Sequence, residues 1–422
     1  MIETPRNWAG NITYSAARLH HPESVAQVQQ LIARRRKLKV IGARHSFTDI
    51  ADSPEDLVSL DRFEPAVAVD ATRRTATISG SVRYEDLCGK LHRAGYALHN
   101  MASLPHVTVA GACATGTHGS GDGNGCLSTA VAAMEVVTGN GDVVDFSRER
   151  HGEQFDGMVV ALGGLGVVTR MTLDIQPAFE MRQDVYENLP LAQVFEHLDA
   201  IFAAGYSVSL FTDWRGPRIN QVWLKRRIAD NAALDAPPVW FEATRARRQL
   251  DPVGNAGDEC TGQLGIPGPW HQRLPHFRMA YMPEQGRELQ SEYMVPRQHA
   301  VAALQALDRL RDRIAPHLQM SEIRTIAADN LWMSPFYQQA SIALHFTWKP
   351  DWPAVSRLLP AIEEALTPFA ARPHWGKLFT MPAARVQSLY AKLPDFEQLL
   401  REYDPQGRFR NRFLDTYVFA TH

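Results

Sequence analysis

The chain has 422 residues, enough for two or three domains with a large apolar core. Its charge is balanced, with 44 lysines and arginines against 46 aspartates and glutamates, so the basic surface of a nucleic-acid-binding protein is not expected. The sequence shows no apolar signal core at its N-terminus, no uncharged apolar run of about 18 residues and no cysteine or histidine spacing typical of a metal site. We therefore expect a cytoplasmic protein with neither a membrane partner nor a metal.

The first part of the chain alternates helices, strands and hairpins, which predicts an α+β fold rather than a doubly wound parallel sheet. Gly95 follows a helical pattern as a left-handed cap, and Gly139-Asn140-Gly141 is a strong hairpin turn signal. The expected elements are a helix at 25–36, strands at 38–41 and 57–60, a hairpin of 66–70 with 75–79, a helix at 84–93, a hairpin of 131–138 with 142–146, and a short helix, glycine turn and strand within 154–169.

The pattern changes near Gln176-Pro177 and again after residue 374. Between these points, paired strands and long amphipathic helices predict an antiparallel sheet covered on one face, with a Pro/Gly-rich, partly ordered insertion at 235–275. The expected elements there are helices at 191–203, 298–313 and 353–369 and strands at 207–214, 219–227, 288–295, 320–327 and 341–348. We therefore expect a first domain at 1–177, a second domain at 178–374 and a C-terminal segment, 375–422, that returns to the first domain.

A segment of small residues, 101–121, is the most unusual stretch of the sequence. Its central part, 110–119, reads Ala-Gly-Ala-Cys-Ala-Thr-Gly-Thr-His-Gly, so a ligand can approach the backbone closely. Glycines permit conformations in which successive N–H groups form an anion-binding nest, and Thr115, Thr117 and Ser120 add hydroxyls. This composition favours a diphosphate-binding loop, although a packing seam between a strand and a loop would have the same composition.

Three of the expected strands carry polar residues two positions apart, which puts each pair on one face of its strand. The pairs are Gln290 with Glu292, Glu322 with Arg324, and His345 with Thr347. One such strand is typical of a sheet with a solvated face. Three of them, with Lys377 close to the domain junction, predict a polar pocket floor suited to a hydroxyl-rich ligand.

Longer motifs accompany these patterns. They are Asn7-Trp8-Ala9-Gly10-Asn11, Gly42-Ala43-Arg44-His45-Ser46, Ser103-Leu104-Pro105-His106, Ala114-Thr115-Gly116-Thr117-His118-Gly119, Ser209-Leu210-Phe211-Thr212-Asp213-Trp214-Arg215, Pro267-Gly268-Pro269-Trp270-His271, Glu322-Ile323-Arg324 and Pro373-His374-Trp375-Gly376-Lys377. With them the whole chain resembles the vanillyl-alcohol-oxidase superfamily of FAD enzymes and, within it, the alditol oxidases (xylitol oxidases). The resemblance implies a two-domain α+β fold in which the N- and C-terminal segments form the FAD domain and an inserted substrate (cap) domain is built on an antiparallel sheet.

The resemblance also implies roles for individual residues. His45 would attach FAD covalently through the flavin 8α carbon, and Ser103 would face the isoalloxazine ring. The other residues implied at the cofactor are Ile41, Gly42, Ala43, Arg44, Ser46, Thr108, Gly111, Ala114, Thr115, Gly116, Thr117, His118, Val168 and His374. Those implied at the substrate are Ser103, Gln290, Glu322, Arg324, His345, Thr347 and Lys377. The chain departs from the family pattern at Arg44, where many members of the superfamily have glycine.

The implied reaction is oxidation of the terminal CH₂OH of an alditol such as xylitol or sorbitol to the aldose, by hydride transfer to the flavin, with reduction of oxygen to hydrogen peroxide. Of the expected catalytic residues, His345 is the first choice as base because an unperturbed histidine is nearly neutral at physiological pH. Lys377 and Arg324 would stabilise developing negative charge, and Glu322 would orient Arg324 or bind a second hydroxyl. Activity should then rise with pH through a histidine-like group.

Two other functions fit the same residues. An aldonolactone oxidase or dehydrogenase of the same superfamily would use the flavin site on a cyclic substrate. A flavin reductase would draw electrons from NADPH, but a polar floor of glutamate, arginine, histidine and lysine favours the polyol. We expect the partners to be a small polyol and oxygen, and the protein to be a monomer.

Overall fold

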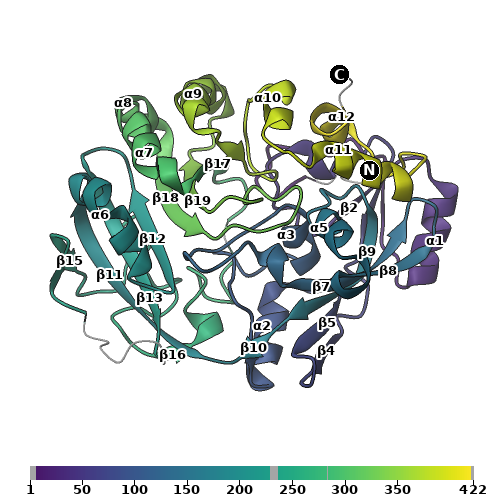
Figure 1. Cartoon of the computed structure of the whole chain (residues 1–422), viewed down its shortest axis with the longest axis horizontal. Helices are drawn as coiled ribbons and strands as arrows, with labels where there is room; N and C mark the ends of the chain where they lie inside the picture. The colour runs from purple at the N-terminus through teal and green to yellow at the C-terminus, as the bar shows by residue number, and fades with distance from the viewer. Residues whose placement is uncertain (1–5, 229–235, 283, 420–422) are drawn as a thin grey trace.

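The computed structural model describes residues 6–228, 236–282 and 284–419. Within them the chain forms two large sheets, the larger in the left half of Figure 1 and the smaller in the right half. Asp235, the first residue of the expected Pro/Gly-rich insertion, lies outside the described residues, as do residues 1–5 of the N-terminus. In the described part of the chain, no helix is both long enough and apolar enough to cross a membrane.

The larger sheet has ten strands and is antiparallel throughout. Its order is β14-β15-β11-β13-β12-β18-β19-β17-β20, with β16 paired to β11. The strands are β11 (Glu180–Pro190), β12 (Ser207–Thr212), β13 (Arg218–Arg227), β14 (Val239–Trp240), β15 (Ala243–Arg245), β16 (Gly268–Pro269), β17 (Leu289–Pro296), β18 (Leu318–Ile326), β19 (Ser341–Trp348) and β20 (Arg372–Pro373). The antiparallel sheet expected from the sequence is thus present.

β11 corrects the sequence analysis, which expected no strand between 177 and 191. Its residues Gln183 and Asp184 are fully buried, although both are polar. Asp184 is neutralised by Arg226 and Arg245, whose guanidinium nitrogens lie 3.0 and 2.7 Å from its carboxylate oxygens. A charged residue thus lies at a buried position of β11, where arginines distant in sequence neutralise it. The sequence therefore does not show the alternation of apolar and polar residues that would predict a strand.

Four helices lie along the outer side of the larger sheet in Figure 1. They are α6 (Leu191–Ala203), α7 (Ala300–Asp308), α8 (Arg311–Ile314) and α9 (Trp352–Ala365). The helix expected at 298–313 is therefore two helices, and the one expected at 353–369 ends at Ala365. Pro368 explains the second difference, because proline disfavours helical backbone at the residue before it, and a 3₁₀ turn, Thr367–Phe369, follows instead.

The first part of the chain contains three smaller sheets. A five-stranded antiparallel sheet has the order β4-β5-β9-β7-β8, a parallel sheet the order β1-β3-β2, and β6 pairs with β10. The strands are β1 (Arg18–His20), β2 (Leu38–Ile41), β3 (Asp56–Ser59), β4 (Val67–Asp70), β5 (Thr75–Ser79), β6 (Tyr96–Ala97), β7 (Val131–Thr138), β8 (Val143–Ser147), β9 (Gly166–Asp174) and β10 (Gln176–Pro177). The helices are α1 (Val25–Arg34), α2 (Tyr84–Arg93), α3 (Val109–Ala114), α4 (Arg148–His151) and α5 (Glu153–Val159). Both expected hairpins are present.

The C-terminal segment packs against this first part of the chain (Figure 1). It forms α10 (Ala383–Ser388), α11 (Leu393–Tyr403) and α12 (Arg412–Tyr417). The Leu38 N–H donates to the carbonyl of Arg408 at 2.8 Å, and the Asn411 amide donates to the carbonyl of Asp52 at 2.8 Å. The exact domain boundaries expected from the sequence stay a prediction.

Candidate active site

A cavity of about 450 Å³ is lined both by loops of the first part of the chain and by the larger sheet. The contributing loops lie at 41–47, 102–104, 107–117 and 162–163. The contributing strands are β17, β18 and β19, on the face opposite to α7 and α9. The cavity therefore brings the segment of small residues and the polar floor, which are far apart in sequence, into one site.

The loop that carries His45 is held from two sides. The Trp8 N–H donates to the carbonyl of Arg44 at 2.8 Å, and the Asn7 amide donates to the carbonyl of Ser46 at 2.9 Å. From the other side, the Phe47 N–H donates to the carbonyl of Gly376 at 2.7 Å. Two motifs at opposite ends of the sequence thus fix the loop beside Lys377.

His45 itself is packed among aromatic rings. Its imidazole stacks on the indole of Trp8, with centroids 4.3 Å apart and planes at 17°, and its centroid lies 4.7 Å from that of His106. Burial, together with the neighbouring His106 and Lys377, lowers the pKa of His45 to about 3. Its Nε2 is buried without a hydrogen-bond partner among the described residues. The ring is therefore neutral near pH 7 and keeps a nitrogen lone pair for a bond to a cofactor.

The small-residue loops pack so closely around Thr108 that their glycines leave no room for a side chain. A Cβ on Gly42 would lie 2.2 Å from Oγ1 of Thr108, and one on Gly111 would lie 2.7 Å from the same atom. Arg44 has a φ of 58°, the left-handed region where glycine is favoured and other residues are strained. The backbone at Arg44 thus has the conformation that glycine adopts most easily, and the arginine does not change it. The cavity, the small residues that line it and the unpartnered His45 nitrogen fit FAD as the bound group.

Two of the expected cofactor residues do not line the cavity. Gly116 has a φ of 67° and packs against the ring of Pro335, which a Cβ would approach to 2.9 Å. Val168 lies within β9 and pairs with Val136 of β7. The others all line it: Ile41, Gly42, Ala43, Arg44, His45, Ser46, Ser103, Thr108, Gly111, Ala114, Thr115, Thr117, His118 and His374.

The polar floor follows from the strand register. In the order β17-β19-β18, His345 lies between Glu292 and Glu322, and Thr347 lies between Gln290 and Met320. All these side chains line the cavity, together with Arg324 and Lys377. The alternate residues, such as Ile323, Leu344 and Phe346, are fully buried, as expected of the face that packs under the helices. Every residue expected at the substrate thus lies in one cavity.

Glu292 is at the centre of the charged cluster, although the sequence predicted it only as part of the polar floor and gave it no role at the substrate or in catalysis. Its Oε1 accepts a hydrogen bond from Nη2 of Arg324 at 2.7 Å and lies 3.2 Å from Nε2 of His118. Its Oε2 lies 2.9 Å from Nζ of Lys377. The two-residue spacing from Gln290 places Glu292 on the polar face of its strand. The central position of Glu292 depends on the order of the strands, which the sequence does not show.

The charges of this cluster shift several pKa values. Burial alone would raise the pKa of Glu292, but Lys377, His118 and Arg324 hold it well below its ordinary range. Likewise, Arg324 and His276 outweigh burial and lower the pKa of Glu322. Burial and the neighbouring Lys377 lower the pKa of His345 to about 4. At neutral pH the floor therefore carries two carboxylates, cationic Arg324 and a neutral imidazole.

His345 and Lys377 form a direct pair. Nζ of Lys377 lies 2.8 Å from Nδ1 of His345, and Nε2 of His345 lies 3.1 Å from Oγ1 of Thr347. Burial lowers the pKa of Lys377, while Glu292 opposes that shift. A neutral imidazole beside a lysine whose proton is less firmly held is an arrangement that can accept and pass on a proton.

One residue missed by the sequence analysis is His276. It directly follows the Pro/Gly-rich stretch, and it lines the cavity with its Nε2 2.6 Å from Oε1 of Glu322. No periodicity or motif in this part of the chain marked it.

Comparison with known proteins finds two family matches along the chain. Residues 16–147 match the FAD-binding domain family, and residues 276–417 match the D-arabinono-1,4-lactone oxidase family. An alditol oxidase of a Streptomyces species is 49% identical over 413 residues, 97% of each chain. An L-gulonolactone oxidase of Scyliorhinus torazame is 26% identical over 437 residues, 98% of each chain. A solvent-stable cholesterol oxidase has the same fold, with a TM-score of 0.79 at 15% identity, covering 98% of this chain and 97% of its own. The chain therefore belongs to the alditol oxidase family, within the vanillyl-alcohol-oxidase superfamily of FAD-dependent oxidoreductases.

Proposed function

We propose that this protein oxidises the terminal primary hydroxyl of alditols such as xylitol and sorbitol to the aldose and reduces oxygen to hydrogen peroxide, with FAD attached covalently through His45. The observation that carries the proposal is the floor of Glu292, His345, Arg324 and Lys377 in the same cavity as the His45 loop. The family membership supports the same substrate class. We also propose that the protein acts as a cytoplasmic monomer.

The proposal assigns the cofactor to the loops of small residues. Gly42, Thr108 and Gly111 would border the diphosphate, and His45 would bind the flavin ring. Bound FAD would supply the hydride acceptor and the site of reaction with oxygen. The neutral His45 ring supports this assignment, since a protonated imidazole has no free lone pair.

The proposed role of the floor is to bind a chain of hydroxyls and to take a proton from one of them. Hydroxyls are both donors and acceptors, and the floor offers both kinds of partner: carboxylates at Glu292 and Glu322 and cations at Arg324 and Lys377. His345 is neutral at physiological pH, so it can accept the hydroxyl proton. For this, the substrate hydroxyl must replace either Lys377 or Thr347 as the partner of the His345 ring. When Lys377 gives up its contact with His345, Glu292 can still hold it, because Oε2 of Glu292 lies 2.9 Å from Nζ of Lys377.

Oxidation of an aldonolactone is the second candidate, and the match of residues 276–417 to a lactone oxidase family favours it. Anaerobic titration of the purified holoenzyme separates the candidates by bleaching of the flavin absorbance. We expect xylitol to bleach the flavin at a lower concentration than L-gulono-1,4-lactone, and NADPH not to bleach it. Faster and more complete bleaching by the lactone would overturn the alditol proposal, and bleaching by NADPH alone would identify a reductase.

A further inference from the structure

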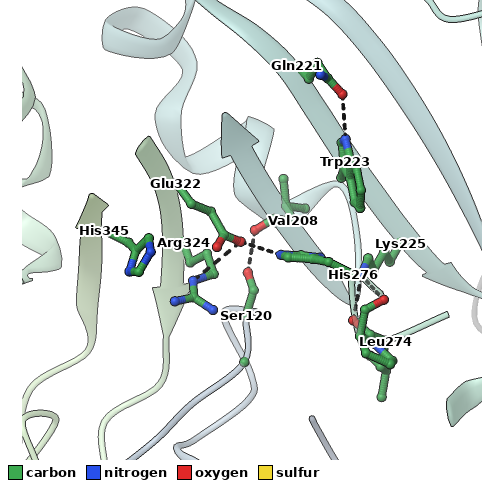
Figure 2. A network of polar contacts seen from close by, with 12 residues as sticks. Ser120, Val208, Gln221, Trp223, Lys225, Leu274, His276, Glu322, Arg324 and His345 are labelled. Carbon is green, nitrogen blue, oxygen red and sulfur yellow. Dashed lines mark hydrogen bonds and ion pairs between the residues drawn. The ribbon is translucent and has the colours of Figure 1, made fainter. Parts of the chain in front are cut away.

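His276 reaches the cavity from a segment that has almost no regular secondary structure. Figure 2 shows its ring between Lys225 of β13 on one side and Glu322 of β18 on the other. Nε2 lies 2.6 Å from Oε1 of Glu322, and Nδ1 lies 3.2 Å from Nζ of Lys225. Lys225 is fully buried and also donates to the carbonyls of Leu274 and Pro275, at 2.6 and 3.2 Å.

These contacts fix both the plane and the proton of the imidazole. The rings of Phe211 and Trp223 pack against it edge to face, with centroid distances of 5.4 and 5.1 Å. Trp223 in turn donates from its indole N–H to Oε1 of Gln221 at 2.9 Å. The ionised carboxylate of Glu322 can only accept, so the proton of the neutral ring lies on Nε2 and is donated to Glu322. Nδ1 is then the acceptor that faces Nζ of Lys225.

One oxygen of Glu322 is therefore engaged and the other is not. Oε1 accepts from His276 and lies 3.6 Å from Nε of Arg324. Within residues 6–228, 236–282 and 284–419, no hydrogen bond or ion pair reaches Oε2, and Glu322 lines the cavity. The carboxylate is thus held in one orientation with a free acceptor left for a ligand hydroxyl.

We propose that His276, fixed by Lys225, is a positioning residue that orients Glu322 to accept a hydrogen bond from a substrate hydroxyl. This proposal rests on the proposed function. A carboxylate free to rotate would lose part of its binding energy in ordering each time a substrate binds.

The test compares steady-state kinetics and thermal shifts of holoenzyme variants with xylitol. His276→Phe keeps an aromatic ring between Phe211 and Trp223 but removes the donor, while His276→Gln keeps a donor near the Nε2 position. Lys225→Met removes the group that contacts Nδ1 and holds the ring in place. His271→Phe is the matched control, because His271 is a buried histidine of the same segment that does not line the cavity.

We expect His276→Phe to raise KM for xylitol about tenfold, because a carboxylate that is no longer fixed must be ordered each time the substrate binds. Its kcat and FAD content should stay near wild type, and the rise in Tm that xylitol causes should shrink. His276→Gln should restore most of the KM, Lys225→Met should resemble His276→Phe, and His271→Phe should behave as wild type.

An unchanged KM for xylitol in His276→Phe, or a fall in kcat without a rise in KM, would overturn the inference. If His276→Phe does not fold, His276→Gln and Lys225→Met carry the test, and a wild-type KM in Lys225→Met overturns the role of Lys225. A wild-type enzyme that turns over no alditol would instead overturn the proposed function, and with it this inference.

Discussion

Nζ of Lys377 lies 2.9 Å from Oε2 of Glu292. Glu292 lies on β17, and Lys377 lies in the segment that follows β20, the strand paired with β17. Backbone hydrogen bonds hold the two together, since the His374 N–H donates to the carbonyl of Glu292 at 3.0 Å and the Leu378 N–H donates to the carbonyl of Gln290 at 2.8 Å. Glu292 also binds Arg324, so one carboxylate holds two cations of the floor, Arg324 and Lys377. The positions of both cations therefore depend on Glu292.

The first prediction concerns the charge of Glu292. Glu292→Gln leaves Arg324 and Lys377 without their shared buried partner, and removal of one member of a buried ion pair costs about 3–5 kcal/mol. We expect the free energy of unfolding, measured by urea denaturation at pH 7, to fall by about that amount. Glu187→Gln is the control, because Glu187 lies on β11 of the same sheet and makes no ion pair among the described residues; it should change stability little.

The effect of Glu292→Gln should depend on pH. The pKa of Glu292 is held below its ordinary value, so its stabilisation is fully present above the pKa of an unfolded glutamate, about 4.3, and is lost as the pH falls through the lower folded pKa. The difference between wild type and variant should then be largest above about pH 5 and shrink below about pH 4. A difference that stays constant down to pH 3 would contradict the depressed pKa.

The pH dependence of activity should reflect burial of His345. Its pKa is lowered to about 4, so the base is available well below the usual histidine range. We expect kcat/KM for xylitol to rise with pH around 4 and to be flat by pH 6, in the free-enzyme profile. Because the pKa of Lys377 is also lowered, activity should fall at a pH below the ordinary lysine range. An acid limb centred near 6.5 would show that His345 is not in the environment described here.

Another prediction concerns the two cations of the floor. Arg324→Ala and Lys377→Ala should each lower kcat/KM about 100- to 1,000-fold, because fixed charges near developing negative charge typically contribute that much. The flavin spectrum should stay as in wild type. Arg218→Ala and Lys349→Ala, at exposed positions of β13 and just after β19, are the matched controls and should keep full activity. Near wild-type rates in both floor variants would mean that the substrate binds elsewhere.

A fourth prediction concerns the flavin linkage. Acid-precipitated wild-type protein should keep its yellow colour in the pellet, and His45→Ala should release it into the supernatant. His106→Ala is the control, because His106 lies beside His45 but does not line the cavity, and its pellet should stay yellow. Free FAD released from wild type by acid would rule out the covalent bond.

Much of the fold could be predicted because its elements have strong local signals. The helices at 84–93 and 191–203 and the strand at 341–348 have the expected bounds, since apolar periodicity and terminating residues mark them. β11 could not be predicted, because Asp184 lies at a buried position and is neutralised by arginines more than 40 residues away.

The candidate site, like the fold, was predicted only in part. The spacing of Glu322 with Arg324 and of His345 with Thr347 was enough to predict a polar face. The central position of Glu292 follows only from the strand order, and His276 reaches Glu322 through a segment that carries no periodic pattern. Residues whose partners are set by tertiary packing leave no mark in the local sequence.

Release of hydrogen peroxide by the purified holoenzyme, with xylitol, sorbitol, glycerol, propanol and L-gulono-1,4-lactone at equal concentration, tests the central claim most directly. The buried donors and acceptors of the floor should reject analogues that lack hydroxyls, because they would stay unpaired. We predict one peroxide and one aldose per xylitol or sorbitol oxidised, slower turnover of glycerol and almost none of propanol. A clear preference for the lactone, or turnover of propanol at the xylitol rate, would contradict the account.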